Sequence, residues 1–263
     1  MRRGSVAPLG AVALSGFALV LGAVLAWGRS GPTPLDTWWN GLMTQVQAPV
    51  LTEIALFLNV FGGPLLAGLI VPALLVLLLV LRRRLWAAGF LVVASALSAG
   101  AVEVIKLLVR RPRPGDVEIA TNSFAFPSGH TANATVVVLA LALIWAAQRW
   151  IRFVGALYIL AMALSRTYLH AHWLTDVVAG FLLAAGIALL AWALGRRVLQ
   201  RKEDEAQSHR GHPREHAVDR LVLVGLVTPS PGKQFVQRDE HHHPRDNPVE
   251  HPEEGRRHDP RDQ

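Results

Sequence analysis

Three short polar segments interrupt the apolar part of this 263-residue chain, and each carries side chains that suit phosphate chemistry. The segments are KLLVRRPRP at 106–114, FPSGHTAN at 126–133 and SRTYLHAHWLTD at 165–176. Ionisable groups beside membrane-spanning runs are costly, so they are functional candidates by default. If the fold brings the three segments to one face, their groups form a single site.

The cations of these segments predict an anion-binding site. Lys106, Arg113 and Arg166 suit a phosphate, and a planar guanidinium group matches the geometry of phosphate oxygens. In the second segment, Ser128 and Gly129 come just before a helix that we expect to begin near residue 131. The N-terminus of a helix offers free N–H groups and a partial positive charge.

Two histidines supply candidate reacting groups. His130 lies on the same turn as the glycine of the second segment, where it is suited to donate a proton. His172 and Asp176 are four residues apart and share a face if their segment is helical. A carboxylate there holds one ring nitrogen of His172, fixes its tautomer and leaves the other nitrogen free to attack phosphorus.

The composition narrows the chemistry. The chain has no Cys, which excludes a thiol nucleophile, disulfides and thiolate metal ligands. A metal site of His170, His172 and Asp176 is disfavoured, because the ligand set is thin and neighbouring cations oppose a metal ion. The sequence therefore predicts neither a metal nor a cofactor.

The remaining polar residues of the segments have plainer expected roles. Glu103 precedes the lysine of the first segment by three residues, which predicts an ion pair. We expect His170 to serve in packing, and Arg110 and Arg111 to anchor lipid head groups. We expect Ser165 to hydrogen-bond the site.

Apolar runs separate these segments and predict an all-α membrane protein with six transmembrane helices in residues 1–200. A hydrocarbon core about 30 Å thick takes roughly 20 helical residues to cross. The runs lie near 8–28, 62–81, 86–108, 131–148, 153–169 and 177–195. Residues 50–61 predict a further helix in the interface. The first run resembles a signal peptide, but its length favours a retained span.

Basic residues in the loops predict the topology, because such residues favour the cytoplasmic side. If the basic residues between and after the runs all face the cytoplasm, six spans place both termini there as well. These residues are Arg82–Arg84, Arg149, Arg152, Arg196 and Arg197. The three polar segments then face the outside of the cell membrane. Residues 1–195 hold 13 Lys and Arg against 6 Asp and Glu. Membrane topology explains this excess better than nucleic-acid binding, so we expect no nucleic-acid partner.

Residues 201–263 differ from the rest in composition. They are rich in charged residues and Pro, and residues 196–263 hold eight of the eleven histidines. This composition predicts a disordered cytoplasmic tail. We have no functional hypothesis for it.

Read together, the three segments resemble the three-part signature of the type 2 phosphatidic acid phosphatase (PAP2) superfamily. The pattern is Lys106-x6-Arg113-Pro114, then Pro127-Ser128-Gly129-His130, then Ser165-Arg166-x5-His172-x3-Asp176. All three parts are present and in order, and the resemblance spans roughly residues 60–195. It implies a six-helix membrane fold with the site near the outer surface, and a metal-independent phosphatase that works through a phosphohistidine.

The resemblance also implies a role for each residue. His172 attacks phosphorus and Asp176 orients it, while His130 protonates the leaving oxygen and then helps to activate water. The phosphate oxygens are held by Lys106, Arg113, Ser128, Gly129 and Arg166. Donors fixed around the developing charge are the main source of catalysis in phosphoryl transfer.

The substrate implied is a lipid, and two kinds remain open. One is undecaprenyl pyrophosphate, and the other is phosphatidic acid or a phosphatidylglycerophosphate type of glycerolipid. A lipid phosphotransferase with the same site and a non-catalytic anion-binding membrane protein are the alternatives. The expected partners are therefore the membrane and a phospholipid or polyprenyl pyrophosphate substrate, and the sequence gives no oligomeric state.

Overall fold

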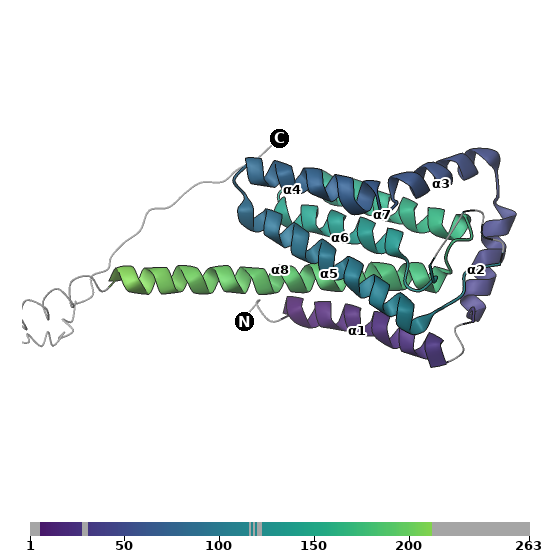
Figure 1. Ribbon diagram of the computed structural model, residues 1–263, viewed down its shortest axis with the longest axis horizontal. Coiled ribbons are helices and arrows are strands. Elements are labelled where there is room, and N and C mark those ends of the chain that lie inside the picture. Colours follow the sequence, from purple (N-terminus) through teal and green to yellow (C-terminus); the bar gives the residue numbers. More distant parts are fainter. Residues whose placement is uncertain (1–5, 28–30, 116, 118, 120–122, 212–263) are drawn as a thin grey trace, which may run out of the picture. The chain divides into compact units, whose positions relative to one another are not determined.

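A computed structural model of the chain is helical, with no strand in the residues that it describes (Figure 1). These residues are 6–27, 31–115, 117, 119 and 123–211, apart from the side chains of 6–9, 25–27 and 199–211. The elements are α1 (Val6–Trp27), α2 (Pro34–Gln45), α3 (Pro49–Phe61), the π-helical turn η1 (Leu66–Ile70), α4 (Val71–Leu81), α5 (Leu85–Val109), α6 (Gly129–Ile144), α7 (Arg149–Tyr168) and α8 (Leu174–Gly211).

Every predicted apolar run coincides with a helix, but the count of six spans is not confirmed. Among the described residues, α5, α7 and the Leu174–Val198 part of α8 are long and apolar enough to cross a membrane. Helix α3 and the η1–α4 segment reach that length only together, with a bend of 43° between them. The apolar part of α1, Gly10–Val24, and α6 are shorter.

Helix α2 begins with a reciprocal pair of hydrogen bonds. The Thr33 hydroxyl oxygen accepts from the backbone N–H of Asp36, and the Asp36 carboxylate accepts from the N–H of Thr33. Pro34 occupies the first turn, where its missing N–H does no harm. In Figure 1, α2 lies crosswise to the long helices, near the end of the bundle where α7 ends and α8 begins.

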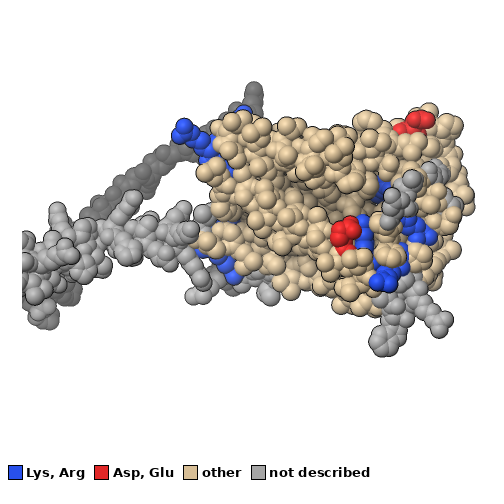
Figure 2. Space-filling model, in the orientation of Figure 1, with Lys and Arg blue, Asp and Glu red and all other residues tan. Residues whose placement is uncertain are grey.

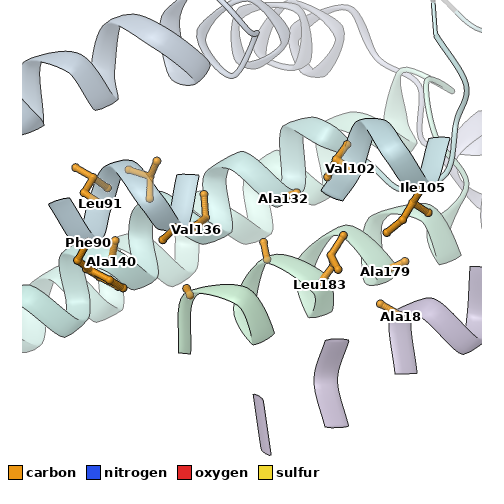
Figure 3. Packing of buried hydrophobic residues seen from close by; sticks show 14 of the residues in the cluster. Ala18, Phe90, Leu91, Val102, Ile105, Ala132, Val136, Ala140, Ala179 and Leu183 are labelled. Atoms are coloured by element: carbon orange, nitrogen blue, oxygen red, sulfur yellow. The ribbon is translucent and has the colours of Figure 1, made fainter. Parts of the chain in front are cut away.

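The main core lies between α1, α5, α6 and α8 (Figure 3). Most of its side chains are small or aliphatic, which lets the helices approach closely, as helices do inside membranes. The buried residues labelled in Figure 3 are Ala18, Phe90, Leu91, Val102, Ile105, Ala132, Val136, Ala140, Ala179 and Leu183.

The surface is apolar between two charged ends. Large apolar side chains are exposed along α1, α3, α4, α5 and α7. On the face shown in Figure 2, Lys and Arg atoms gather toward the two ends of the described bundle, and the band between them carries no charge. An apolar surface of this extent is unfavourable in water and compatible with lipid. The chain is accordingly a membrane protein.

The first residues of the polar C-terminal part are helical, which differs from the predicted disordered tail. Helix α8 continues to Gly211, so residues 201–211 are helical and not part of an irregular tail. The first compact unit of the chain extends to Ser208. Residues 212–263, with the three histidines at 241–243, lie outside the described residues.

Candidate active site

The three polar segments converge at helix ends. The first follows α5, the second leads into α6, and the third covers the end of α7 and the start of α8. One cavity of about 970 Å³ is lined by residues from all three segments. Its lining includes six of the eight predicted site residues: Lys106, Arg113, Gly129, His130, Arg166 and His172. Ser128 and Asp176 are fully buried and lie behind this surface.

His172 is held in one tautomer by a backbone carbonyl. It lies in the turn between α7 and α8 and is buried. Its Nδ1 is 2.7 Å from the carbonyl oxygen of Ala125. Because a carbonyl only accepts, Nδ1 carries the proton. The bare Nε2 faces NH1 of Arg113 at 3.2 Å, on the cavity side.

Asp176 does not form the expected hydrogen bond with His172. Its Oδ2 is 3.7 Å from Nδ1 of His172 and instead accepts from the backbone N–H of Trp173 at 2.8 Å. Its Oδ1 accepts from Arg111 at 2.5 Å. The prediction failed because His172 precedes α8, so the spacing rule for residues on one helix does not apply to the pair. Asp176 nevertheless lies close to the ring, at the 3.7 Å that separates Oδ2 from Nδ1.

Arg113 is fixed beside His172. Its Nε donates to the carbonyl oxygen of Ser123 at 2.9 Å, and its NH1 donates to the carbonyl oxygen of Ala171. Burial lowers the pKa of Arg113 below its usual value, and the charge of Asp176 opposes that shift. These bonds place NH1 of Arg113 beside Nε2 of His172.

The other two cations approach from different helices. Lys106 of α5 pairs with Glu103 at 2.9 Å, which confirms the predicted ion pair. Arg166 of α7 is buried, and its NH1 donates to the side-chain oxygen of Asn59 on α3 at 2.7 Å. These cations and Arg113 line one cavity, which is an arrangement suited to a phosphate group.

Helix α6 begins at Gly129, two residues before the predicted start. No side chain caps this N-terminus. The hydroxyl of Ser128 accepts a hydrogen bond from Thr131, and its N–H donates to the carbonyl oxygen of Asp176 at 3.0 Å. Ser128 therefore holds the loop, and the uncapped first turn that follows it offers N–H groups to an anion.

Gly180 allows the loop to lie against α8. A Cβ atom at this position would stand 2.5 Å from the carbonyl oxygen of Ser128. A backbone atom cannot yield as a flexible side chain does, so this helix face requires glycine. At Gly129, by contrast, a Cβ atom would be 3.7 Å from Nζ of Lys106, which leaves space beside the amine.

His130 reaches the cavity from the first turn of α6. Its Nε2 lies 3.2 Å from the carbonyl oxygen of Asn59, so this nitrogen carries a proton. Asn59 thereby contacts two site residues, one through its backbone and one through its side chain. Its sequence signal is a lone amide near the end of the apolar run 50–61.

Two supporting residues, Arg111 and Ser165, differ from their expected roles, and His170 agrees with its expected role. Arg111 is completely buried and so does not anchor a head group. The Ser165 hydroxyl donates to the carbonyl oxygen of Met162 within α7 and not to the site. His170 is buried with Nδ1 2.7 Å from the side-chain oxygen of Asn40, in agreement with a packing role.

The described residues contain no group of three or more His, Cys, Asp or Glu side chains close enough to hold a metal ion. The cavity presents three cations instead, and away from them it is lined by apolar and small residues of η1, α4 and α5, among them Leu69, Ala73 and Val92. The site is thus cationic at one end and apolar along the rest, which suits an anionic lipid.

Comparison with known proteins agrees with this geometry. Residues 84–199 match the PAP2 superfamily. The decaprenylphosphoryl-5-phosphoribose phosphatase of Mycobacterium tuberculosis is 33% identical over 161 residues, which are 57% of this chain and 84% of that protein. The chain therefore belongs to the PAP2 superfamily, and the resemblance read from the three motifs is confirmed.

Other similar proteins are also lipid phosphatases. The undecaprenyl-diphosphatase of Sulfolobus acidocaldarius is 28% identical over 122 residues, covering 44% of this chain and 58% of that protein. The crystal structure of a PAP2 type phosphatidylglycerolphosphate phosphatase from Bacillus subtilis has a TM-score of 0.62 at 22% identity, covering 72% of this chain and 96% of that one. The latter likeness shows that the fold is shared.

Proposed function

We propose that this protein is a phosphatase that removes a terminal phosphate from a polyprenyl-linked lipid through a phosphohistidine on His172. The observation that carries the proposal is the convergence of His172 Nε2, three cations and the uncapped N-terminus of α6 at one end of an apolar cavity. This arrangement unites a nucleophile, an oxyanion cradle and space for a chain.

His172 is suited to act as the nucleophile. Burial and the charges of Arg113 and Arg166 lower the pKa of His172 well below 6.5. The ring is therefore neutral at neutral pH, and Nε2 has a free lone pair. That lone pair attacks phosphorus, and the bond from phosphorus to the leaving oxygen breaks.

The cations stabilise the phosphoryl group as it transfers. The phosphate oxygens, which carry the negative charge, face two sets of donors. These are the side chains of Lys106, Arg113 and Arg166 and the N–H groups of the first turn of α6. Such fixed donors lower the barrier because they need no reorganisation during the reaction.

His130 completes the cycle. In its imidazolium form, which the anionic phosphate in the cavity favours, His130 gives one proton to the leaving oxygen. The neutral ring that remains then takes a proton from water as that water attacks phosphorus. The bond between phosphorus and nitrogen breaks, its electron pair returns to His172, and inorganic phosphate leaves. No other acid or base of the described cavity is needed for this sequence.

The substrate class follows from the cavity and the relatives. The apolar part of the cavity is lined by η1, α4 and α5 and continues from the cationic end, so it suits a hydrocarbon chain attached to the phosphate. The Mycobacterium and Sulfolobus relatives are named for polyprenyl-linked substrates. The cavity suits either class of lipid, and the names of the relatives favour a polyprenyl lipid over phosphatidic acid or phosphatidylglycerophosphate.

We further propose that the chain crosses the cell membrane several times and that the site faces outward. Lys106 lies in the last turn of α5, at the site. Arg82–Arg84 precede α5 and therefore lie at the end of this helix that is far from the site. Arg149, at the start of α7, shares that end, because α7 reaches the site at Arg166. Basic residues favour the cytoplasmic side, so the site is extracytoplasmic.

The test is phosphate release by purified protein in detergent with a chelator present. We expect release from undecaprenyl pyrophosphate and from decaprenylphosphoryl-5-phosphoribose to exceed release from phosphatidic acid. The variant His172→Ala should lose about three orders of magnitude or more in kcat, because it lacks the nucleophile. Preference for phosphatidic acid would contradict the lipid class. Full activity of His172→Ala would contradict the mechanism, and dependence on a divalent metal would contradict metal independence.

A further inference from the structure

A buried cluster of charges lies behind the site and centres on Arg111. Its NH1 donates to Oδ1 of Asp176 at 2.5 Å, and its NH2 donates to Oδ2 of Asp36 at 2.6 Å. All three side chains are completely buried. The cluster joins α2, the segment after α5 and the first turn of α8.

Thr175 connects the same three residues. Its N–H donates to Oδ1 of Asp36 at 2.9 Å, and its hydroxyl donates to the same carboxylate. The hydroxyl oxygen accepts from NH1 of Arg111 at 2.7 Å. Burial raises the pKa of Asp36, but hydrogen bonds from Thr175, Arg111 and Thr33 outweigh it and leave the pKa below 3.8. Asp36 is therefore ionised at neutral pH.

The charges of the cluster do not cancel. Two carboxylates and one guanidinium leave one net negative charge, and Oδ2 of Asp176 lies 3.7 Å from Nδ1 of His172. Nδ1 keeps its proton through its bond to Ala125, so the ring becomes positive when Nε2 bonds to phosphorus. If Asp36 were neutral, Arg111 and Asp176 alone would form a neutral pair. Charges interact strongly in a buried site, where water screens them little.

We propose that Asp36 and Arg111 are positioning residues for phosphoryl transfer. Arg111 holds Asp176 in place, and Asp36 offsets the charge of Arg111 so that a net negative charge remains beside the His172 ring as the phosphohistidine forms. The inference rests on the proposed function. It extends the machinery of the site to α2, which lies outside the residues that match the family.

The test compares turnover with the number of competent sites in full-length protein. Vanadate, which binds in the phosphate cradle, gives the number of sites by titration calorimetry. Undecaprenyl pyrophosphate gives kcat and KM. For Asp36→Asn and for Arg111→Lys, we expect about a ten-fold or greater fall in kcat per vanadate-binding site, with KM and stoichiometry little changed, because each loses a charge-assisted contact of the cluster.

Two control variants test whether the effect is specific to the buried cluster. Arg110→Lys alters the exposed neighbour of Arg111, and Glu53→Gln neutralises an exposed acid on α3. Both should behave as the unmodified protein. The double variant Asp36→Asn, Arg111→Lys should lose no more kcat per site than Arg111→Lys alone, because both residues act through one cluster.

Two outcomes would overturn the proposal. Unchanged kcat per site with fewer vanadate sites would show that the cluster only stabilises the fold. Unchanged kcat and unchanged stoichiometry would show that it has no role. If Arg111→Lys does not accumulate, Asp36→Asn decides alone. Vanadate binding without His172-dependent turnover in the unmodified protein would instead contradict the proposed function.

Discussion

Two regions of the chain build the site, and they act on it in different ways. The ends of α5, α6, α7 and α8 place charged and titratable groups in the cavity itself. The α2–α3 region, residues 34–61, mainly holds those groups: Asp36 binds Arg111, and Asn59 binds Arg166 and His130. On the proposed mechanism, one region therefore contacts the phosphate, and the other fixes the geometry of the contacts.

This division has a physical basis. Groups that touch the phosphate must occupy fixed positions around one small ion. They therefore lie together in short segments at the helix ends that surround the ion. A supporting group needs only to reach its partner from any element packed nearby. Supporting residues are consequently scattered singly along the chain, whereas contacting residues come in short segments.

The largest effect should come from the contacting region. Arg113→Gln removes a guanidinium 3.2 Å from Nε2 of His172, and kcat/KM should fall by about 10²–10³, as for loss of one fixed donor. Without that positive charge, protonation of His172 becomes easier and its pKa rises toward 6.5. Since the neutral ring is the proposed nucleophile, the acid limb of the pH profile of kcat/KM should move to higher pH.

The shift in the His172 pKa should be partial, because burial and the charges of Arg166 and Lys106 still oppose protonation of the ring. Arg110→Gln serves as the control, since the Arg110 side chain is exposed and bonds only locally, to the carbonyl oxygen of Leu107. An unaltered profile for Arg113→Gln would separate Arg113 from the nucleophile and weaken the distinction between the regions.

A somewhat smaller effect is expected from a residue that carries no functional group. Gly180→Ala places a methyl group against the carbonyl oxygen of Ser128 and pushes the loop before α6 away from α8. A displacement of about 1 Å at the cradle should lower kcat/KM roughly 10²-fold. Gly100→Ala on α5, where nothing lies within 4 Å, is the matched control. Equal activity of the two variants would mean that the loop tolerates the shift.

The supporting region should show a milder response. Asn59→Leu removes the side-chain acceptor of Arg166 but keeps the backbone carbonyl that faces His130. The freed guanidinium should bind phosphate less well, with a rise in KM of about ten-fold and a small change in kcat. Gln45→Leu, an exposed amide on α2, is the control in the same kinetic assay. A large fall in kcat would instead place Asn59 among the residues that act directly.

The smallest effect should fall on His170, although it is only two residues from His172. Its φ of 50° lies in the left-handed region, which asparagine tolerates. His170→Asn should therefore keep the backbone, lose the contact with Asn40 on α2, and change kcat/KM by less than about three-fold, as for one neutral hydrogen bond. A loss as large as that of His172→Ala would mean that the two histidines work together.

Sequence reasoning identified the groups that line the cavity because their types and spacing carry the chemistry. Lys106, Arg113, His130, Arg166 and His172 all line it as expected. The long apolar runs likewise predicted where helices lie, although run length alone did not confirm how many of them cross a membrane.

The supporting contacts were not predictable, because each joins residues far apart in the chain. Arg111 looked like a surface cation, and its burial is explained by two carboxylate partners far away in the chain, Asp36 and Asp176. The pattern Thr33-Pro34-Leu35-Asp36 signals the start of a helix, but it accounts for Asp36 as a cap and gives no hint of a second role. The carbonyl oxygen of Ala125 fixes the tautomer of His172, and a backbone contact of this kind leaves no side-chain pattern in the sequence.

The contact between Asp36 and Thr175 also bears on how the protein is made. The two residues are 139 positions apart, and synthesis proceeds from the N-terminus. Asp36 is synthesised first and Arg111 later. Asp176, the second acid of the cluster, is added only when α8 is synthesised. A chain that ends before α8 has Asp36, Arg111 and His172 but lacks Asp176, so the buried cluster is incomplete. On the proposed mechanism, such a truncated chain should therefore be inactive.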